Sequence, residues 1–313
     1  MRKLRLLTLL LIGAVLITGA WVYRNKFAPK PVGSGPAGPN MSRQDFSSAW
    51  TDRKVLLLGV GDSVTAGFGV PKDHTYFEML LKNPADDDPA MQGINLSAVL
   101  PNLKKQNIAM SGSTSITHLD IVQERLESQP ADVFGLVVIT SGGNDLIHNY
   151  GRSKPREGAM YGATLEQARP WIENYENRLN QIIEIIEQRF PGGCMIFLAD
   201  IYDPSDGVGD AQNAGLPRWP DGVAIQKAYN AAIYRTADKH KSVHIVPMYE
   251  MFLGHGIHCT ESSFAHYRPE DPYYWYASNL EDPNARGYDA IRRLFLTEIA
   301  KQAKNIAGNN SSP

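Results

Sequence analysis

Three residues of the chain together suit acyl transfer. Ser63, Gly112 and Asn144 each come shortly after a run of residues that is typical of a strand. A serine hydroxyl can attack a carbonyl carbon, and a backbone N–H and a side-chain amide can stabilise the resulting oxyanion. If the three runs are parallel strands of one sheet, all three residues lie at its carboxyl edge, where such sheets bind ligands. Each residue alone also fits an ordinary turn, so the combination carries the prediction.

The elements that would position these residues alternate between strands and helices. Short apolar runs predict strands, and apolar residues three or four positions apart predict helices. The predicted strands are 55–58, 107–110, 134–140, 194–200 and 243–246, and the predicted helices are 76–82, 116–129, 170–190, 223–240 and 288–301. Such alternation is typical of an α/β protein with a parallel sheet and helices on both faces.

The motifs around these residues resemble those of the SGNH (GDSL-type) hydrolases. Gly61-Asp62-Ser63 looks like the first block of that family, residues 107–112 (NIAMSG) like the second, and Gly142-Gly143-Asn144-Asp145 matches its Gly-x-Asn-Asp block. The resemblance covers residues 55–301 and implies a flavodoxin-like three-layer α/β/α sandwich. It also implies hydrolysis of carboxylic esters through an acyl-enzyme, with no metal and no cofactor. By position, Ser63 is the nucleophile, and Ser63 N–H, Gly112 N–H and the Asn144 side chain form the oxyanion hole.

The last block of the family pattern is where this chain departs. The family has Asp-x-x-His-Pro-Asn before the final helix, which supplies the general base and the carboxylate that orients it. Here residues 279–284 read NLEDPN, so Asp282 stands in place of the histidine and Asn279 in place of the aspartate. A carboxylate can accept a proton from serine, but its ordinary pKa of about 3.9 makes it a weak base at neutral pH.

A second stretch offers a histidine. Residues 255–258 (HGIH) resemble the family's Asp-Gly-Ile-His, with the segment up to Asp282 as an insertion that splits the block. Neutral imidazole has suitable basicity, so His258 is the first candidate for the general base. The other candidates for the base are Asp282, His266 and His255, and the carboxylates that could orient His258 are Glu261, Glu270, Asp271 and Asp282. Loop histidines without a catalytic role are the alternative.

Other interpretations of the loops stay open. The insertion 260–277 holds Tyr267, Tyr273, Tyr274, Trp275 and Tyr276, which could stack on sugars, cover acyl groups or simply pack on the domain. His255, His258, Cys259 and His266 could ligate zinc, and Asp203, Asp206 and Asp210 calcium, although neither spacing fits a standard pattern. Cys194 and Cys259 could form a disulfide outside the cytoplasm.

The N-terminus predicts a membrane segment. Arg2, Lys3 and Arg5 precede an apolar run at residues 6–23, which is typical of a signal anchor or of a cleaved export signal. The basic end should stay in the cytoplasm, which puts the rest of the chain outside it, in a periplasmic or extracellular location. The predicted organisation is an anchor at 1–26, a flexible Pro/Gly-rich linker at 27–50, the hydrolase domain at 51–306 and a disordered tail at 307–313.

Composition narrows the function. The net charge of −2 does not favour nucleic acid as a partner, and no phosphate-binding glycine motif is complete. The expected partners are a small-molecule, carbohydrate or lipid ester and the membrane. The leading hypothesis is a membrane-anchored serine esterase outside the cytoplasm. The rival is an SGNH-like binding module that has lost its general base.

Overall fold

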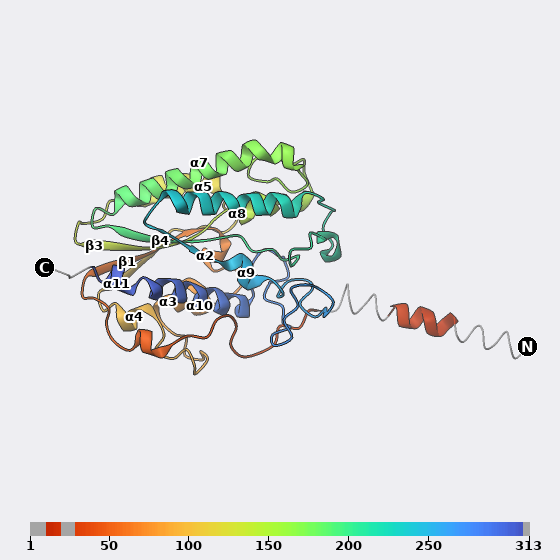
Figure 1. Ribbon diagram of the computed structural model, residues 1–313, viewed down its shortest axis with the longest axis horizontal. Helices are drawn as coiled ribbons and strands as arrows, with labels where there is room; N and C mark the ends of the chain where they lie inside the picture. The colour runs from red at the N-terminus through yellow and green to blue at the C-terminus, as the bar shows by residue number, and fades with distance from the viewer. Residues whose placement is uncertain (1–10, 20–28, 309–313) are drawn as a thin grey trace, which may run out of the picture.

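A computed structural model describes residues 11–19 and 29–308 of the chain (Figure 1). Its centre is a five-stranded, fully parallel sheet with the strand order β2-β1-β3-β4-β5. The strands are β1 (Lys54–Gly61), β2 (Leu103–Asn107), β3 (Val133–Thr140), β4 (Cys194–Ala199) and β5 (Val243–Val246). This order is the flavodoxin-like one, with the ligand crevice expected between β1 and β3. The expected parallel α/β sheet is confirmed.

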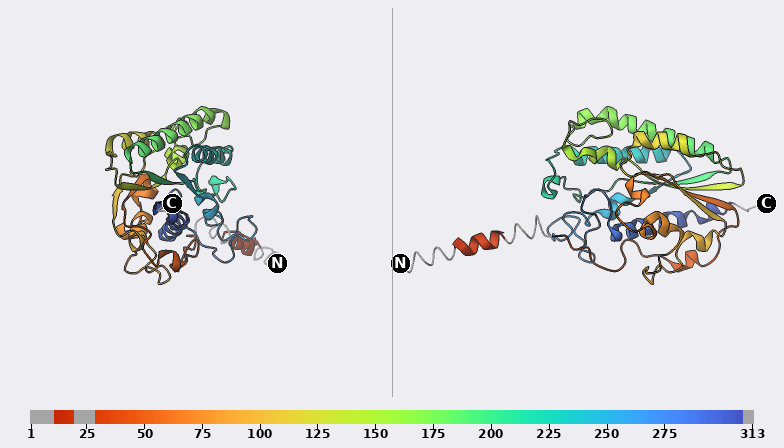
Figure 2. Two further views of the ribbon diagram at one scale, coloured as in Figure 1. Left: turned by 60° about the vertical axis from the view of Figure 1, so that its left-hand side comes forward. Right: turned by 180° about the vertical axis from the view of Figure 1, so that it is seen from behind.

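Helices cover both faces of the sheet (Figures 1 and 2). The longer helices are α3 (Tyr76–Leu81), α5 (Ser115–Arg125), α7 (Leu165–Arg189), α8 (Gly222–Lys239) and α10 (Ala285–Lys301). The shorter ones are α2 (Ser63–Ala66), α4 (Leu96–Val99), α6 (Gly143–Ile147), α9 (Met248–Phe252), α11 (Ala303–Ile306), η1 (Arg43–Phe46), η2 (Lys72–His74), η3 (His148–Gly151) and η4 (Ala211–Ala214). Helices α5, α7 and α8 lie on one face, and α3 and α10 lie on the other.

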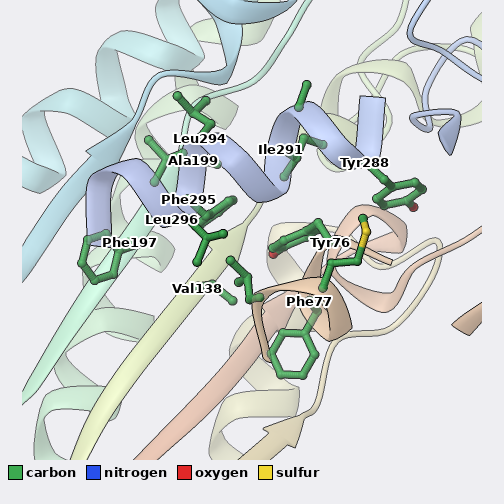
Figure 3. Close-up of a cluster of buried hydrophobic side chains, with 14 of the residues drawn as sticks. Tyr76, Phe77, Val138, Phe197, Ala199, Tyr288, Ile291, Leu294, Phe295 and Leu296 are labelled. Atoms are coloured by element: carbon green, nitrogen blue, oxygen red, sulfur yellow. The ribbon is translucent and has the colours of Figure 1, made fainter. Parts of the chain in front are cut away.

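Alternation along the strands divides the core in two. Leu57 and Val138 point to the α3–α10 side, whereas Leu58 and Val137 point to the α5–α7–α8 side. On the α10 side, the rings of Tyr76 and Phe295 stack with centroids 5.0 Å apart (Figure 3). Both faces of the sheet are therefore buried, which explains why its central strands are continuous apolar runs.

Several predicted boundaries differ from the structure by a few residues, and two of the differences have a clear physical reason. Strand β2 covers the polar residues 103–107 rather than 107–110, because it is an edge strand with only one neighbour and less need for apolar side chains. Helix α7 begins at Leu165 rather than at Pro170. Thr164 and Gln167 form a capping box there, which satisfies the first N–H groups five residues earlier than the proline suggests.

The predicted membrane segment lies only partly within the described residues. Residues 11–19 are helical and largely exposed, and the remainder of the run at 6–23 lies outside the described ranges. No helix of the described ranges is both long and apolar enough to cross a bilayer.

The Pro/Gly-rich segment packs on the domain instead of forming a free linker. We call residues 31–37 the N-terminal strap. Tyr274 N–H donates to Pro31 O (2.8 Å), and the Arg286 guanidinium donates to Ser34 O (2.8 Å). Ala37 is buried beside α10, and its N–H donates to Asp289 (3.1 Å). The folded domain therefore includes residues that the sequence analysis assigned to the linker.

The two cysteines are not paired. Cys194 begins β4, at the edge of the sheet where the strands start, whereas Cys259 follows α9 beyond the carboxyl edge. Burial raises the pKa of both thiols to about 12. The disulfide considered from the sequence is absent.

Candidate active site

Ser63 lies where β1 ends and the short helix α2 begins. Asp62 caps this helix, since its carboxylate accepts from Val64 N–H (3.1 Å) and from the Thr140 hydroxyl at the end of β3 (2.8 Å). Gly61 has φ of +141°, and an added Cβ would lie 2.3 Å from Thr140 O. Only glycine fits at position 61, because any side chain would clash with β3. The Gly-Asp-Ser order therefore lets β1 run close to β3 and places the serine directly after the strand.

Hydrogen bonds join the three predicted segments at this point. Met110 N–H and the Ser113 hydroxyl both donate to Gly61 O (2.9 and 3.2 Å). The Asn144 side-chain NH₂ donates one hydrogen to Ser113 O (2.9 Å), which leaves its second hydrogen available. Gly112 lies between these anchors in a left-handed conformation, with φ of +78°. The structure thus brings Ser63, Gly112 and Asn144 to one edge of the sheet.

Two backbone donors complete the arrangement. Within the described ranges, the N–H groups of Ser63 and Gly112 have no intramolecular hydrogen-bond acceptor. Together with the second Asn144 hydrogen they provide the donors that an oxyanion requires. Asp145, the last residue of the third block, is fully buried and accepts from Ser115 N–H (2.8 Å) and the Ser115 hydroxyl (2.6 Å). Its role is to join α6 to the start of α5.

A buried histidine that the sequence analysis missed stabilises this arrangement. His118 Nε2 lies 2.7 Å from the Ser113 hydroxyl, and Nδ1 lies 2.9 Å from the Ser141 hydroxyl. Burial lowers the pKa of His118 to about 3, so the ring is neutral. It bridges the loop of Gly112 to the loop of Asn144. No local motif marks it, because one of its two partners, Ser141, lies 23 residues further along the chain.

Burial also changes the acidity of Asp62. Its pKa is raised to about 7, mainly because the carboxyl is removed from water. Hydrogen bonds from Thr140 and Val64 lower the pKa, and the charge of Asp282 raises it. Asp282 is therefore close enough to Asp62, the residue before Ser63, for its charge to raise the pKa of that carboxyl.

The pocket around Ser63 contains carboxylates but no histidine. It is lined by Asp62, Ser63, Val64, Thr140, Ser141, Gly143, Asn144, Asp200, Ile201, Tyr202, Met248 and Glu281. Glu281 is a lining residue that the sequence analysis did not single out. Burial raises its pKa, and the charge of Asp282 adds to that rise.

His258, the first candidate for the general base, is engaged elsewhere. Its Nε2 lies 3.0 Å from both carboxylate oxygens of Asp210, its Nδ1 lies 3.0 Å from Glu261 Oε1, and its ring stacks on Phe264. Glu261 does orient His258, as expected, but toward Asp210 and not toward Ser63. The geometry does not support His258 as the base.

The other two histidines of this region are also occupied or distant. The His255 ring stacks on Trp275, with centroids 3.4 Å apart, and burial lowers its pKa to about 3. His266 lies beside Gly207. Neither belongs to the residues that line the pocket of Ser63, and Asp282 is not among those residues either.

Asp282 occupies the position that the family pattern predicts for the base. It is 2% exposed, and its Oδ2 accepts from the Asn279 side chain (2.6 Å). This bond has the same i, i+3 spacing as the Asp–His bond of the family. Its Oδ1 is buried and has no hydrogen-bond partner in the described part of the chain. Nearby, the Tyr288 hydroxyl donates to Phe68 O (3.0 Å) and Ser63 O (3.4 Å), which connects α10 to α2.

The aspartates considered as calcium ligands stabilise loops instead. The Asp206 carboxylate accepts from the N–H groups of Gly254, Gly256 and His258 at 2.8–2.9 Å. Asp203 accepts from Ser205 and Gly207. Across residues 11–19 and 29–308, no group of three or more metal-ligating side chains has a suitable arrangement, so neither the zinc nor the calcium interpretation gains support.

The aromatic residues of the insertion mostly lie inside the domain. Tyr274, Trp275 and Tyr276 are buried, and Phe252 packs edge-on against the last two rings. Packing on the domain, the plainest of the three alternatives for this segment, accounts for these rings. They present no open stacking surface.

A serine at the end of a central strand, with Gly112 and Asn144 on the same edge of a 2-1-3-4-5 parallel sheet, is the arrangement of the SGNH fold. The GDSL-like lipase/acylhydrolase family matches residues 60–290, and the chain belongs to that family. It is accordingly a serine hydrolase that acts on ester bonds.

Solved structures share the fold at low sequence identity. An extracellular lipase from Streptomyces rimosus is 17% identical, with a TM-score of 0.52 over 79% of this chain and 99% of that one. A variant of an acetylxylan esterase from Geobacillus stearothermophilus is 17% identical, with a TM-score of 0.50 over 80% of this chain and 95% of that one. A search of curated proteins finds no significant match.

Proposed function

We propose that the protein is a membrane-anchored serine esterase outside the cytoplasm that works through an acyl-enzyme on Ser63. The proposal rests on two hydrogen bonds, from the Ser113 hydroxyl to Gly61 O and from the Asn144 side chain to Ser113 O, which bring the three segments together. Ser63 Oγ attacks the ester carbonyl carbon, and the oxyanion accepts from Ser63 N–H, Gly112 N–H and Asn144. The C–O bond of the ester then breaks and the alcohol leaves with a proton. Water attacks the acyl-enzyme in the same way, which releases the acid and restores Ser63.

For the base, the geometry favours Asp282 over His258. Asp282 stands at the family's histidine position, is held by Asn279 and has a free buried oxygen. In this mechanism its carboxylate takes the proton of Ser63 and returns it to the leaving alcohol oxygen, directly or through one water.

Hydrolysis of p-nitrophenyl acetate by the full chain tests both assignments. Ser63→Ala should abolish turnover above background, and Asp282→Asn should lower kcat by about 10²-fold or more. Asp86→Asn is the matched control, because Asp86 is an exposed carboxylate that does not line the pocket. Equal hydrolysis by wild type and Ser63→Ala would refute the nucleophile. Full activity of Asp282→Asn would refute the base.

A non-catalytic binding module is the second candidate. The observation that favours it is the lack of a histidine among the residues that line the Ser63 pocket. A fluorophosphonate probe distinguishes the two, since it labels only an activated serine. Labelling of wild type but not of Ser63→Ala supports the esterase, whereas no labelling of either protein supports the binding module.

The location rests on the apolar run at 6–23 and the basic residues before it. Membrane fractionation of the full chain, compared with a variant that starts at residue 29, tests the anchor. Recovery of both proteins in the soluble fraction would contradict it. Protease access to the domain in intact cells tests the side of the membrane.

A further inference from the structure

A second hollow opens beside the pocket of Ser63. The two share four lining residues, Gly143, Ile201, Tyr202 and Glu281, so they adjoin each other. The second hollow is bounded by α6, by the loop between β4 and α8, by the start of α8 and by residues 280–281. Its walls are mostly apolar and include Leu146, Ile147, Leu216, Trp219, Val223 and Leu280.

The aromatic wall of this hollow is held firmly. Trp219 Nε1–H donates to Ala163 O (2.8 Å), and the Tyr161 hydroxyl donates to Pro217 O (2.7 Å). The rings of Tyr161 and Trp219 lie 4.7 Å apart. Both rings have their polar atoms engaged with the backbone, so the surfaces that they offer to a ligand are apolar.

The Asp203 and Gln226 side chains of the lining are engaged as well, and the Glu281 carboxylate lies at the end that the hollow shares with the Ser63 pocket. Asp203 accepts from Ser205 and Gly207, and Gln226 donates to Ile201 O (3.0 Å). A sugar would leave its hydroxyls without partners in such a hollow, which is costly, whereas a hydrocarbon chain needs none. The buried rings of Tyr274, Trp275 and Tyr276 remove the sugar-stacking platform that the insertion could have provided.

We propose that this hollow binds the acyl chain of the substrate, so that the enzyme prefers esters of medium-chain fatty acids to acetate esters. The proposal rests on the proposed function, because it takes Ser63 as the point of attack. With the carbonyl carbon at Ser63 and its oxygen toward Asn144, the acyl chain extends past Gly143 and Ile201 into the hollow. Each methylene that enters leaves water and stabilises the bound state, by about 0.8 kcal/mol.

A series of p-nitrophenyl esters tests the preference, because the leaving group stays constant. For the wild type, kcat/KM should rise about three- to fourfold per methylene from acetate toward octanoate. Ala214→Phe fills the hollow and should flatten this rise. Ala224→Phe is the matched control, since Ala224 is an exposed residue of the same α8 region that does not line the hollow. It should behave as wild type.

The outcomes separate the two proposals. Ser63-dependent hydrolysis with no rise along the acyl series, or an equal effect of both phenylalanine variants, would overturn the acyl pocket and leave the esterase intact. A series that varies the alcohol chain at constant acetate should show no comparable rise; if it does, the hollow binds the alcohol side and the proposal is wrong.

A binding measurement keeps the proposal falsifiable if hydrolysis fails. Calorimetric titration of Ser63→Ala with methyl octanoate should show binding that Ala214→Phe in the same background weakens at least tenfold. Binding without Ser63-dependent hydrolysis would refute the esterase mechanism alone. Absence of binding, together with a flat acyl series, would refute the hollow as a chain-binding site.

Discussion

The two halves of the catalytic edge are built differently. The serine half, residues 61–63, 110–113 and 140–145, is a set of short strand-end turns that hydrogen bonds hold directly to one another. The carboxylate half, residues 254–284, is a long segment held by buried rings, by the Asp206 carboxylate and by the N-terminal strap. The serine half resembles the family pattern at each block, whereas in the carboxylate half Asp282 stands where that pattern has histidine.

The difference shows which parts of such a site tolerate change. The nucleophile and oxyanion donors depend on backbone turns that only a few residue types can form, as the close approach at Gly61 illustrates. The base depends on one side chain presented by a loop, so it can change identity while the loop keeps its place. Asn279 and Asp282 preserve the i, i+3 hydrogen bond although both residue types have changed.

After the loss of Ser63 itself, the largest effect should come from the oxyanion hole. Asn144→Ala removes one oxyanion donor and also the bond to Ser113 O, so kcat should fall about 10²- to 10³-fold with little change in KM. Steady-state kinetics with p-nitrophenyl esters measure this, with circular dichroism as the check on folding. A drop of less than threefold in a folded variant would show that Asn144 does not contact the oxyanion.

A substitution in the carboxylate half should change the pH profile. Asp282→His places the family's base on this loop, so the kcat/KM profile should acquire a rise centred near pH 6.5, the ordinary pKa of histidine. We expect kcat at pH 8 to exceed that of Asp282→Asn by about tenfold. If both variants have the same rate and profile, residue 282 does not exchange a proton with Ser63.

His118 should affect stability through pH. Its pKa is about 3 in the folded chain and near 6.5 when unfolded, so the unfolded state binds more protons between these values. The stability that its neutral form provides is present above pH 6.5 and is lost as pH falls toward 3, by up to about 1.4 kcal/mol per pH unit. Urea unfolding of His118→Gln from pH 7 to pH 5 should show a shallower loss than wild type. An unchanged slope would exclude the role of His118.

The smallest effect on activity should come from His258. His258→Asn removes an imidazole that both flanking carboxylates contact, and the free energy of unfolding should fall by about 1–3 kcal/mol. Because His258 is turned toward Asp210, kcat/KM of the folded variant should change less than threefold. A loss of 10²-fold would return His258 to the mechanism and break the contrast between the two halves.

The sequence predicted the fold and the serine half because their signals are local. The apolar runs of β1 and β3 and the three motif blocks lie within a few residues of what they position. Even so, edge strand β2 was shifted, since its polar residues give no apolar signal. The bridge by His118 joins the loop of Ser113 to that of Ser141, 23 residues beyond the histidine, and could not be seen locally.

The carboxylate half was harder for a physical reason. The prediction of His258 relied on chemical suitability and on a short resemblance, whereas the orientation of the ring is set by Asp210, 48 positions earlier in the chain. Asp282 was named from its position in the last block, but its burial and its free oxygen depend on the tertiary packing of the insertion. Residue type alone thus ranked the candidates in an order that the packing does not support.

The strap also decides how the domain is presented. Its Pro31 end is fastened to Tyr274 at the edge of the sheet that carries Ser63, whereas Ile306 near the other end of the chain is held by Arg53, just before β1 starts. The two ends of the described domain therefore lie on opposite sides of it (Figure 1). If residues 1–26 anchor the chain in a membrane, as proposed, they attach at the end of the domain that carries Ser63, and the esters nearest to the site are those in or close to that membrane.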